Sequence, residues 1–275
     1  MLEIPESAVV ARQAHETLLG KTITAVQVNA SPHKFAFFFG DPDRYPALLI
    51  GATFTDGRAF GGQVELSAGD LRLVFSDGIN LRCFSPQSAV PAKHQLCLGL
   101  SDGSHLVSTV QMYGFLAAFY DGENDNPYYQ VAQAKPSPLT DAFDEAYFDA
   151  LWSAGPANLS LKAFLATEQR IPGLGNGVLQ DILFVARLNP RRKLAEVTEP
   201  QRQALFRSIK ETLQAMTRGG GRDTEKDLFG NPGGYVTRMS NKTLEQPCPV
   251  CGGALTRQAY LGGNVYFCPH CQPME

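Results

Sequence analysis

The sequence lacks any apolar run long enough to span a membrane. Its first residues, MLEIPESAVVARQ, carry Glu3 and Glu6 and lack the basic and then apolar pattern of a signal peptide. Internal repeats are also missing, which argues against a repeat protein. We therefore expect a cytoplasmic protein that has no membrane partner. We also expect it to act as a monomer.

Cysteine is scarce outside one short segment near the C-terminus. Of six cysteines, only Cys83 and Cys97 lie elsewhere, within predicted strands. The absence of a spread of cysteines argues against a disulfide-stapled fold. We expect these two residues to be reduced members of the core.

The chain also has no overall excess of positive charge, since its net charge is −3. That balance argues mildly against a nucleic-acid partner, but the charge is unevenly distributed. Residues 1–150 carry a net charge of −8, whereas residues 151–275 carry +5. A polyanionic partner would therefore be held chiefly by the C-terminal half.

The most informative stretch, residues 162–192, predicts two helices joined by a tight turn. Apolar residues recur at helical spacing on both sides of the sequence PGLGNG, at residues 172–177. The simplest interpretation is a helical hairpin with a glycine turn. However, glycines at a helix start leave backbone N–H groups bare, and such groups attract phosphate. The candidate ligands are Gly175, Asn176 and Gly177, with Lys162 one helix earlier and Arg191 and Arg192 after the second helix.

The remaining chain predicts an α+β protein with several parts. A helix is expected at residues 5–19, capped by Ser7. Short apolar segments, among them residues 47–54, alternate with turn signals such as Asp56-Gly57 and Asp77-Gly78, and they predict a β-sandwich or barrel over residues 23–120. Helices follow at 143–154 and 199–217, and the polar, glycine-rich residues 222–243 predict a mobile loop. We divide the chain into a helix plus β-sandwich at 1–133, a linker at 134–140, a helical domain at 141–244 and a metal-binding finger at 245–275.

The C-terminal cysteines form two CxxC pairs, Cys248 with Cys251 and Cys268 with Cys271, separated by sixteen residues. This spacing is typical of a zinc site in which each pair forms one knuckle. The residues between the pairs predict a hairpin that turns at Gly262-Gly263. Because four thiolates leave no open coordination position, we expect one structural Zn²⁺ ion per chain.

Taken together, these motifs resemble the formamidopyrimidine-DNA glycosylase and endonuclease VIII family of base-excision repair enzymes. The resemblance covers residues 1–272 and is strongest at 169–190, 230–235 and 247–272. It implies a helix–two-turns–helix motif, a finger that enters the minor groove, and damaged double-stranded DNA as partner, with the lesion flipped into a pocket. It also implies that Lys162 and Asn176 grip phosphates beside the lesion.

The same resemblance assigns catalytic roles, and here the chain departs from the family. Members begin Met-Pro-Glu and use the proline amine as a Schiff-base nucleophile, whereas this chain has Leu2. Glu3 matches the catalytic glutamate and Glu6 a second acid of the same motif. A family lysine aligns with Phe60, and the finger arginine with Gly263. The residues that fill the gap in the duplex align with Gln111, Met112 and Tyr113.

Three functions remain open from the sequence. The first is a DNA glycosylase with altered or weak lyase activity, in which the primary amine of Met1 is the nucleophile or Glu3 activates water. The second is a catalytically inactive protein that binds damaged or unusual DNA. The third is an RNA-binding protein, because a similar two-turn motif occurs in a ribosomal protein.

Overall fold

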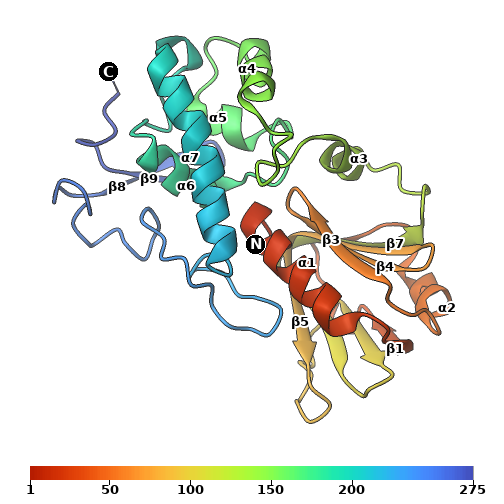
Figure 1. Ribbon diagram of the computed structural model, residues 1–275. Helices are drawn as coiled ribbons and strands as arrows, with labels where there is room; N and C mark the ends of the chain where they lie inside the picture. Colours follow the sequence, from red (N-terminus) through yellow and green to blue (C-terminus); the bar gives the residue numbers. More distant parts are fainter. Residues whose placement is uncertain (275) are drawn as a thin grey trace.

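The structure is a computed structural model that describes residues 1–274. A sheet domain and a helical domain lie side by side, and a two-stranded hairpin lies on the helical domain (Figure 1). This arrangement confirms the α+β class predicted from the sequence. Within residues 1–274, no helix is both long and apolar enough to cross a membrane.

The sheet domain contains a seven-stranded sheet with a long helix, α1, and a short helix, α2, packed against it. The strands follow the order β1-β6-β7-β5-β4-β3; neighbours in this order are antiparallel, and β2 pairs with β7 in parallel. The elements are α1 (Ile4–Leu18), β1 (Ile23–Val28), β2 (Ala36–Phe38), α2 (Tyr45–Leu49), β3 (Asp56–Phe60), β4 (Gln63–Ala68), β5 (Leu71–Phe84), β6 (Leu96–Leu100) and β7 (His105–Tyr120).

Three local predictions in this domain were wrong. The apolar residues 47–54 were expected in a strand, but α2 takes up the first of them because Pro46 starts a short helix there. Asp56-Gly57 was expected to turn, but these residues open β3, which pairs with β4. Ser7 was expected to cap α1, but its hydroxyl donates to the carbonyls of Ile4 and Gly61 instead.

A fourth difference lies at Asp77-Gly78, where the sequence predicted a hairpin turn. The chain instead continues as the 14-residue strand β5, which carries a bulge between Asp77 and Ile79. Asp77 has a left-handed backbone conformation with φ of 59°. A Cβ atom on Gly78 would lie 2.2 Å from the carbonyl oxygen of Tyr113, so only glycine lets β7 approach this closely.

The helical domain follows, and the finger hairpin ends the chain. Helix α3 precedes the helical domain and packs on the sheet, where Tyr129 contacts Phe119 and donates to Glu65. The sequence did not predict this helix, because it lies beside the expected linker. The elements are α3 (Pro127–Ala134), α4 (Glu145–Ala154), α5 (Leu161–Ala166), α6 (Asn176–Val185), α7 (Glu199–Arg218), β8 (Thr256–Tyr260) and β9 (Gly263–Phe267); the short 3-10 helices cover Pro42–Arg44 and Leu194–Glu196. The domain limits given above stay predictions.

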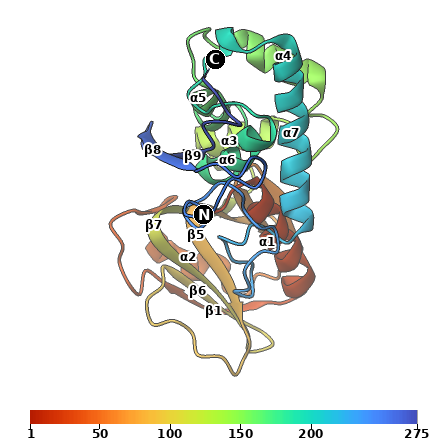
Figure 2. The same cartoon turned by 90° about the vertical axis from the view of Figure 1, so that its left-hand side faces the viewer.

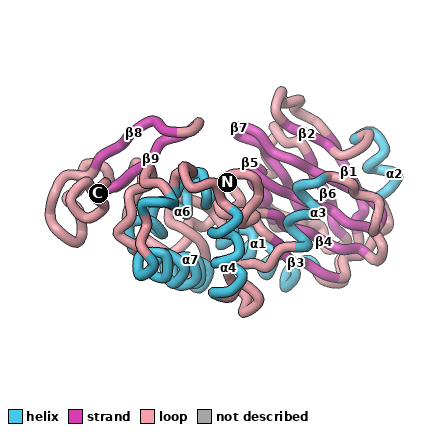
Figure 3. Tube along the Cα trace, turned by 90° about the horizontal axis from the view of Figure 1, so that it is seen from above, coloured by secondary structure: helices cyan, strands magenta, loops and turns pink. Residues whose placement is uncertain are grey.

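The first residues of the chain contribute to both hydrophobic cores. Leu2 packs with the apolar face of the sheet, whereas Ile4 packs among the helices with Phe164 and Ile182. The N-terminus therefore lies at the junction of the two domains, as two further views show (Figures 2 and 3). Glu3, between these two anchors, is held at that junction.

Candidate active site and nucleic-acid interface

Glu3 occupies the N-terminus of α6. Its side chain is buried, with 3% of the residue exposed. One carboxylate oxygen accepts from the Gly177 N–H at 2.8 Å and the other from the Val178 N–H at 2.7 Å. A Cβ on Gly175 would lie 2.4 Å from the nearer oxygen. The predicted bare amides are thus already bound, because the chain supplies its own anion at this helix terminus.

Arg222 completes the surroundings of Glu3. Its Nη1 lies 3.2 Å from a carboxylate oxygen of Glu3. Its Nε and Nη2 donate to the two oxygens of Glu6 at 3.0 and 2.8 Å, and its backbone N–H donates to Glu6 at 3.1 Å. The guanidinium is buried with both acids. Sequence reasoning missed Arg222 because it lies in the segment expected to be a mobile loop.

These contacts determine the protonation chemistry of Glu3. Burial raises the pKa of the Glu3 carboxyl, and the negative charge of Glu6 adds to that rise. The guanidinium of Arg222 and the amides of Gly177 and Val178 oppose the rise because they stabilise the ionised form. A carboxyl with a raised pKa retains its proton to higher pH, and it can therefore act as a general acid.

The two residues before Glu3 are also held by specific contacts. The Leu2 N–H donates to the carbonyl of Asp77, at the β5 bulge, at 2.7 Å. The Met1 amine forms an ion pair with Glu225, and Met1 is partly exposed. The nitrogen of residue 2 is therefore a hydrogen-bonded peptide nitrogen, and the free amine lies one residue further out.

The beginning of the 222–243 segment packs against the sheet domain. Gln13 of α1 donates to Asp227 at 2.9 Å and accepts from the Leu228 N–H at 3.0 Å. The carbonyl of Leu228 accepts from the Cys83 N–H on β5, and the Leu228 side chain is buried in the core of the sheet domain. The part that carries Arg222 is thus anchored in both domains, contrary to the mobile loop expected from its composition.

The two predicted phosphate ligands lie under the finger hairpin. Lys162 is 4% exposed, its ammonium donates to the carbonyl of Tyr260, and burial lowers its pKa. Asn176 donates through Nδ2 to the carbonyl of Asn264 at 3.1 Å, and its buried Oδ1 has no partner among the described residues. Both residues therefore hold the finger, and a phosphate contact stays a prediction.

The arginines after α6 differ from each other. Arg191 is exposed; it donates to Gln258 at 3.2 Å and its guanidinium lies 5.4 Å from the centre of the Tyr260 ring. Arg192 is buried and donates to the carbonyl of Glu196. In this conformation Arg192 therefore links the segment after α6 to the following turn, and the DNA contact expected of Arg192 stays a prediction.

Met112 and Tyr113 lie on β7 opposite the β5 bulge. They are 65% and 41% exposed, as expected of side chains that insert between bases. Burial raises the pKa of Tyr113, and the charges of Asp77 and Glu3 add to this rise. Their insertion into a duplex stays a prediction.

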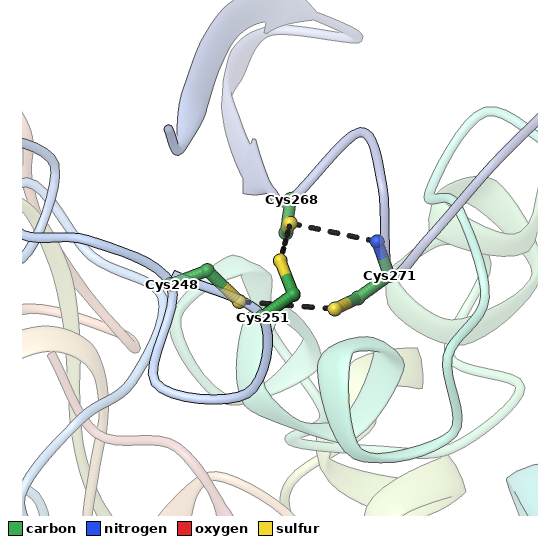
Figure 4. A group of neighbouring side chains, drawn as sticks. All are labelled: Cys248, Cys251, Cys268 and Cys271. Carbon is green, nitrogen blue, oxygen red and sulfur yellow. Dashed lines mark hydrogen bonds between the residues drawn. The ribbon is translucent and has the colours of Figure 1, made fainter. Parts of the chain in front are cut away.

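The four C-terminal cysteines meet in one metal centre (Figure 4). Their sulfur atoms all lie within 4.8 Å of one another, with Sγ–Sγ distances of 3.8 Å for Cys248 and Cys271 and 3.5 Å for Cys251 and Cys268. Zn–S bonds of about 2.3 Å in a tetrahedron give similar separations. The site binds one structural zinc ion, as the sequence predicted. Its four thiolates would supply every ligand, which leaves no position for catalysis.

Loss of either predicted phosphate ligand should weaken DNA binding. We expect Lys162→Ala and Asn176→Ala each to weaken DNA binding by about 1–3 kcal/mol, because each would remove the predicted phosphate contact and loosen the finger. The measurement is DNA affinity across a salt titration. Arg207→Ala, which removes an exposed charge on α7, is the matched control and should change affinity little. Equal affinities for all variants would refute the assignment.

Comparison with known families gives matches at two places in the chain. Residues 135–227 match the formamidopyrimidine-DNA glycosylase H2TH domain, and residues 245–273 match a zinc finger found in FPG and IleRS. A formamidopyrimidine-DNA glycosylase of Legionella pneumophila is 29% identical over 283 residues, covering all of this chain and 99% of the relative. One from Lactobacillus delbrueckii is 27% identical and covers 99% of both chains.

Solved structures agree with this result. The MutM (Fpg) protein of Thermus thermophilus is 25% identical, covers 98% of each chain and superposes with a TM-score of 0.80. The Lactococcus lactis Fpg bound to DNA that contains N7-benzyl-Fapy-dG is 21% identical, covers 98% of this chain and 99% of that one, and has a TM-score of 0.83. At that identity the second likeness shows the fold alone.

Proposed function

Because this chain belongs to the formamidopyrimidine-DNA glycosylase and endonuclease VIII family, we propose that it recognises damaged double-stranded DNA and excises damaged bases. The observation that carries the proposal is the placement of Glu3. Its carboxyl is fixed at the junction of the two domains by Gly177, Val178 and Arg222. A carboxyl held at one point, with a raised pKa, can deliver a proton in a defined direction.

We propose that Glu3 assists cleavage of the glycosidic bond between the base and C1′ of the sugar. Protonation of the sugar ring oxygen or of the departing base would favour release of the base with the bonding electron pair. The attacking group would be water or the amine of Met1. An attacking amine must first lose a proton and leave its ion pair with Glu225.

Strand cleavage is proposed to be weak, for reasons at three positions. The nitrogen of Leu2 is a peptide nitrogen that donates a hydrogen bond to the carbonyl of Asp77, so it cannot form a Schiff base. Phe60, which aligns with the family lysine, packs edge-on against Tyr129. Gly263, which aligns with the finger arginine, offers no cation. The first departure removes the family's nucleophile, and the other two remove cations that would steady the flipped nucleotide and its phosphate.

A second candidate function is binding of damaged DNA without chemistry. The observation that favours it is that both oxygens of Glu3 already accept hydrogen bonds inside the protein. In that case Glu3 would only link the N-terminus to α6, and the DNA-holding residues would act alone.

The deciding experiment is single-turnover base release from a panel of damaged duplexes at high enzyme excess. We expect release of at least one damaged base, with little product trapped by borohydride. If no damaged base is released while the protein binds a damaged duplex tightly, the proposal of an enzyme is wrong and the protein binds damaged DNA without chemistry. A competition in which RNA displaces the duplex would support RNA binding instead.

A further inference from the structure

We propose that Arg222 is the positioning residue for Glu3: its guanidinium, fixed by Glu6, sets the charge and the direction of the Glu3 carboxyl. The inference rests on the proposed function only for the role of Glu3 in catalysis. Its structural part stands on contacts among three buried side chains. Arg222 does not touch the reacting atoms and acts through Glu3.

Glu6 fixes the position of the Arg222 guanidinium, which contacts Glu3 at the same time. Three N–H groups of Arg222, including its backbone amide, donate to the two oxygens of Glu6 at 2.8 to 3.1 Å. This two-pronged arrangement sets the plane of the guanidinium, since an arginine fork binds a carboxylate in a defined geometry. The remaining nitrogen, Nη1, is then directed at Glu3 from 3.2 Å.

Gly177 provides the space that this geometry requires. A Cβ on Gly177 would lie 1.8 Å from Nη1 of Arg222 and 3.0 Å from a carboxylate oxygen of Glu3. The guanidinium therefore occupies the volume of a side chain on the first turn of α6. We infer that glycine at 177 serves to admit Arg222 beside Glu3, in addition to any contact with phosphate.

The charges in this cluster do not balance. Two buried carboxylates, Glu3 and Glu6, share one buried cation, Arg222. The three side chains together would therefore carry a net charge of −1 if both acids were ionised. Glu6 receives three hydrogen bonds from Arg222, whereas Glu3 receives one contact from Arg222 and two amides. Neighbouring carboxylates that cannot both ionise freely force one of them to keep a proton. Other titratable or charged groups lie around this cluster. Glu225 lies 4.0 Å from Nη2 of Arg222 and pairs with the amine of Met1. The charges of Glu3 and Asp77 both help to raise the pKa of Tyr113.

The consequence is that Arg222 sets the pH range over which Glu3 can give up its proton. Its positive charge lowers the pKa of Glu3, whereas Glu6 raises it. Removal of Arg222 should therefore raise the titration midpoint of Glu3, and removal of the charge on Glu6 should lower it. A merely structural arginine would not produce opposite shifts in these two variants.

The test is a carboxyl-detected NMR titration of the full chain labelled with ¹³Cδ-glutamate. The Glu3 resonance is identified by its absence in Glu3→Gln. In Arg222→Met the midpoint should rise by about one pH unit or more, and Arg222→Lys should restore part of the difference because the charge returns without the fork. Arg202→Met is the matched control. It removes an arginine of α7 that forms ion pairs with Asp149 and Glu199, and it should leave the titration midpoint of Glu3 unchanged.

If Arg222→Met fails to fold, Glu6→Gln decides the question alone, with the Glu3 midpoint expected to fall by about one pH unit. An unchanged midpoint in Glu6→Gln, or in a folded Arg222→Met, would overturn the inference. Because this readout needs no substrate, it is independent of base release. Where base release is found, its pH profile should shift in the same direction as the midpoint in each variant.

Discussion

Replacement of Cys268 by serine is expected to release the zinc and unfold the hairpin of β8 and β9. Cys268 is fully buried, and its sulfur is one of only four metal ligands. Zinc binding in small fingers supplies about 10–16 kcal/mol of apparent folding free energy, so loss of one ligand removes most of what orders this segment. The sheet domain has its own core and should stay folded.

Unfolding of the finger should also lower DNA affinity by about 100-fold or more. The reason is that Lys162, Asn176 and Gln180 all lose their hydrogen-bond partners on the hairpin. Contacts of this kind are each worth about 1–3 kcal/mol. The measurements are zinc content, limited proteolysis and DNA affinity of Cys268→Ser. Cys83→Ser, a cysteine of β5 outside the metal site, is the control and should keep its zinc. Full zinc occupancy or unchanged affinity in Cys268→Ser would show that the finger does not depend on this ligand.

Glu3→Gln should reduce single-turnover base release by about 10²–10⁴-fold, which is the usual contribution of a positioned acid or base. Glutamine cannot transfer the proton, and its amide NH₂ would face one of the N–H donors of Gly177 or Val178. We therefore also expect a loss of about 1–3 kcal/mol in the free energy of unfolding, from an unpaired buried donor.

The rate and the stability separate the two roles of Glu3. Glu16→Gln is the matched control, because it changes an exposed acid on α1, the helix that Glu3 precedes. It should alter neither the rate of base release nor the thermal stability. The experiment compares base release and thermal unfolding of wild type and both variants. Base release by Glu3→Gln at the wild-type rate would remove Glu3 from the chemistry and leave it a helix cap.

Features encoded by nearby residues could be predicted from the sequence. The paired CxxC spacing predicts the zinc site, and apolar periodicity predicts α5, α6 and α7 to within a few residues. The family resemblance placed Glu3 in the site. Helix α3 was missed, since its few residues carry little periodic signal beside the expected linker.

Features that depend on distant partners could not be predicted. The anion at the start of α6 comes from Glu3, more than 170 residues earlier in the chain. The partner of Glu6 is Arg222, and nothing local distinguishes it from the other arginines. The Asp77-Gly78 pair favours a turn locally, but pairing of β5 with β7 on both sides keeps the strand extended. Tertiary contacts therefore decided each of these positions.

The placement of Leu2 and Ile4 in opposite cores limits how the two domains can move. Two residues of fully extended chain span only about 7 Å. The domains cannot separate further at this point unless Leu2 or Ile4 is pulled out of its core, which would expose a large apolar side chain to water. Any widening that admits a duplex must therefore be a rotation about the N-terminus, so that the first residues act as the pivot and the far edges of the domains travel most.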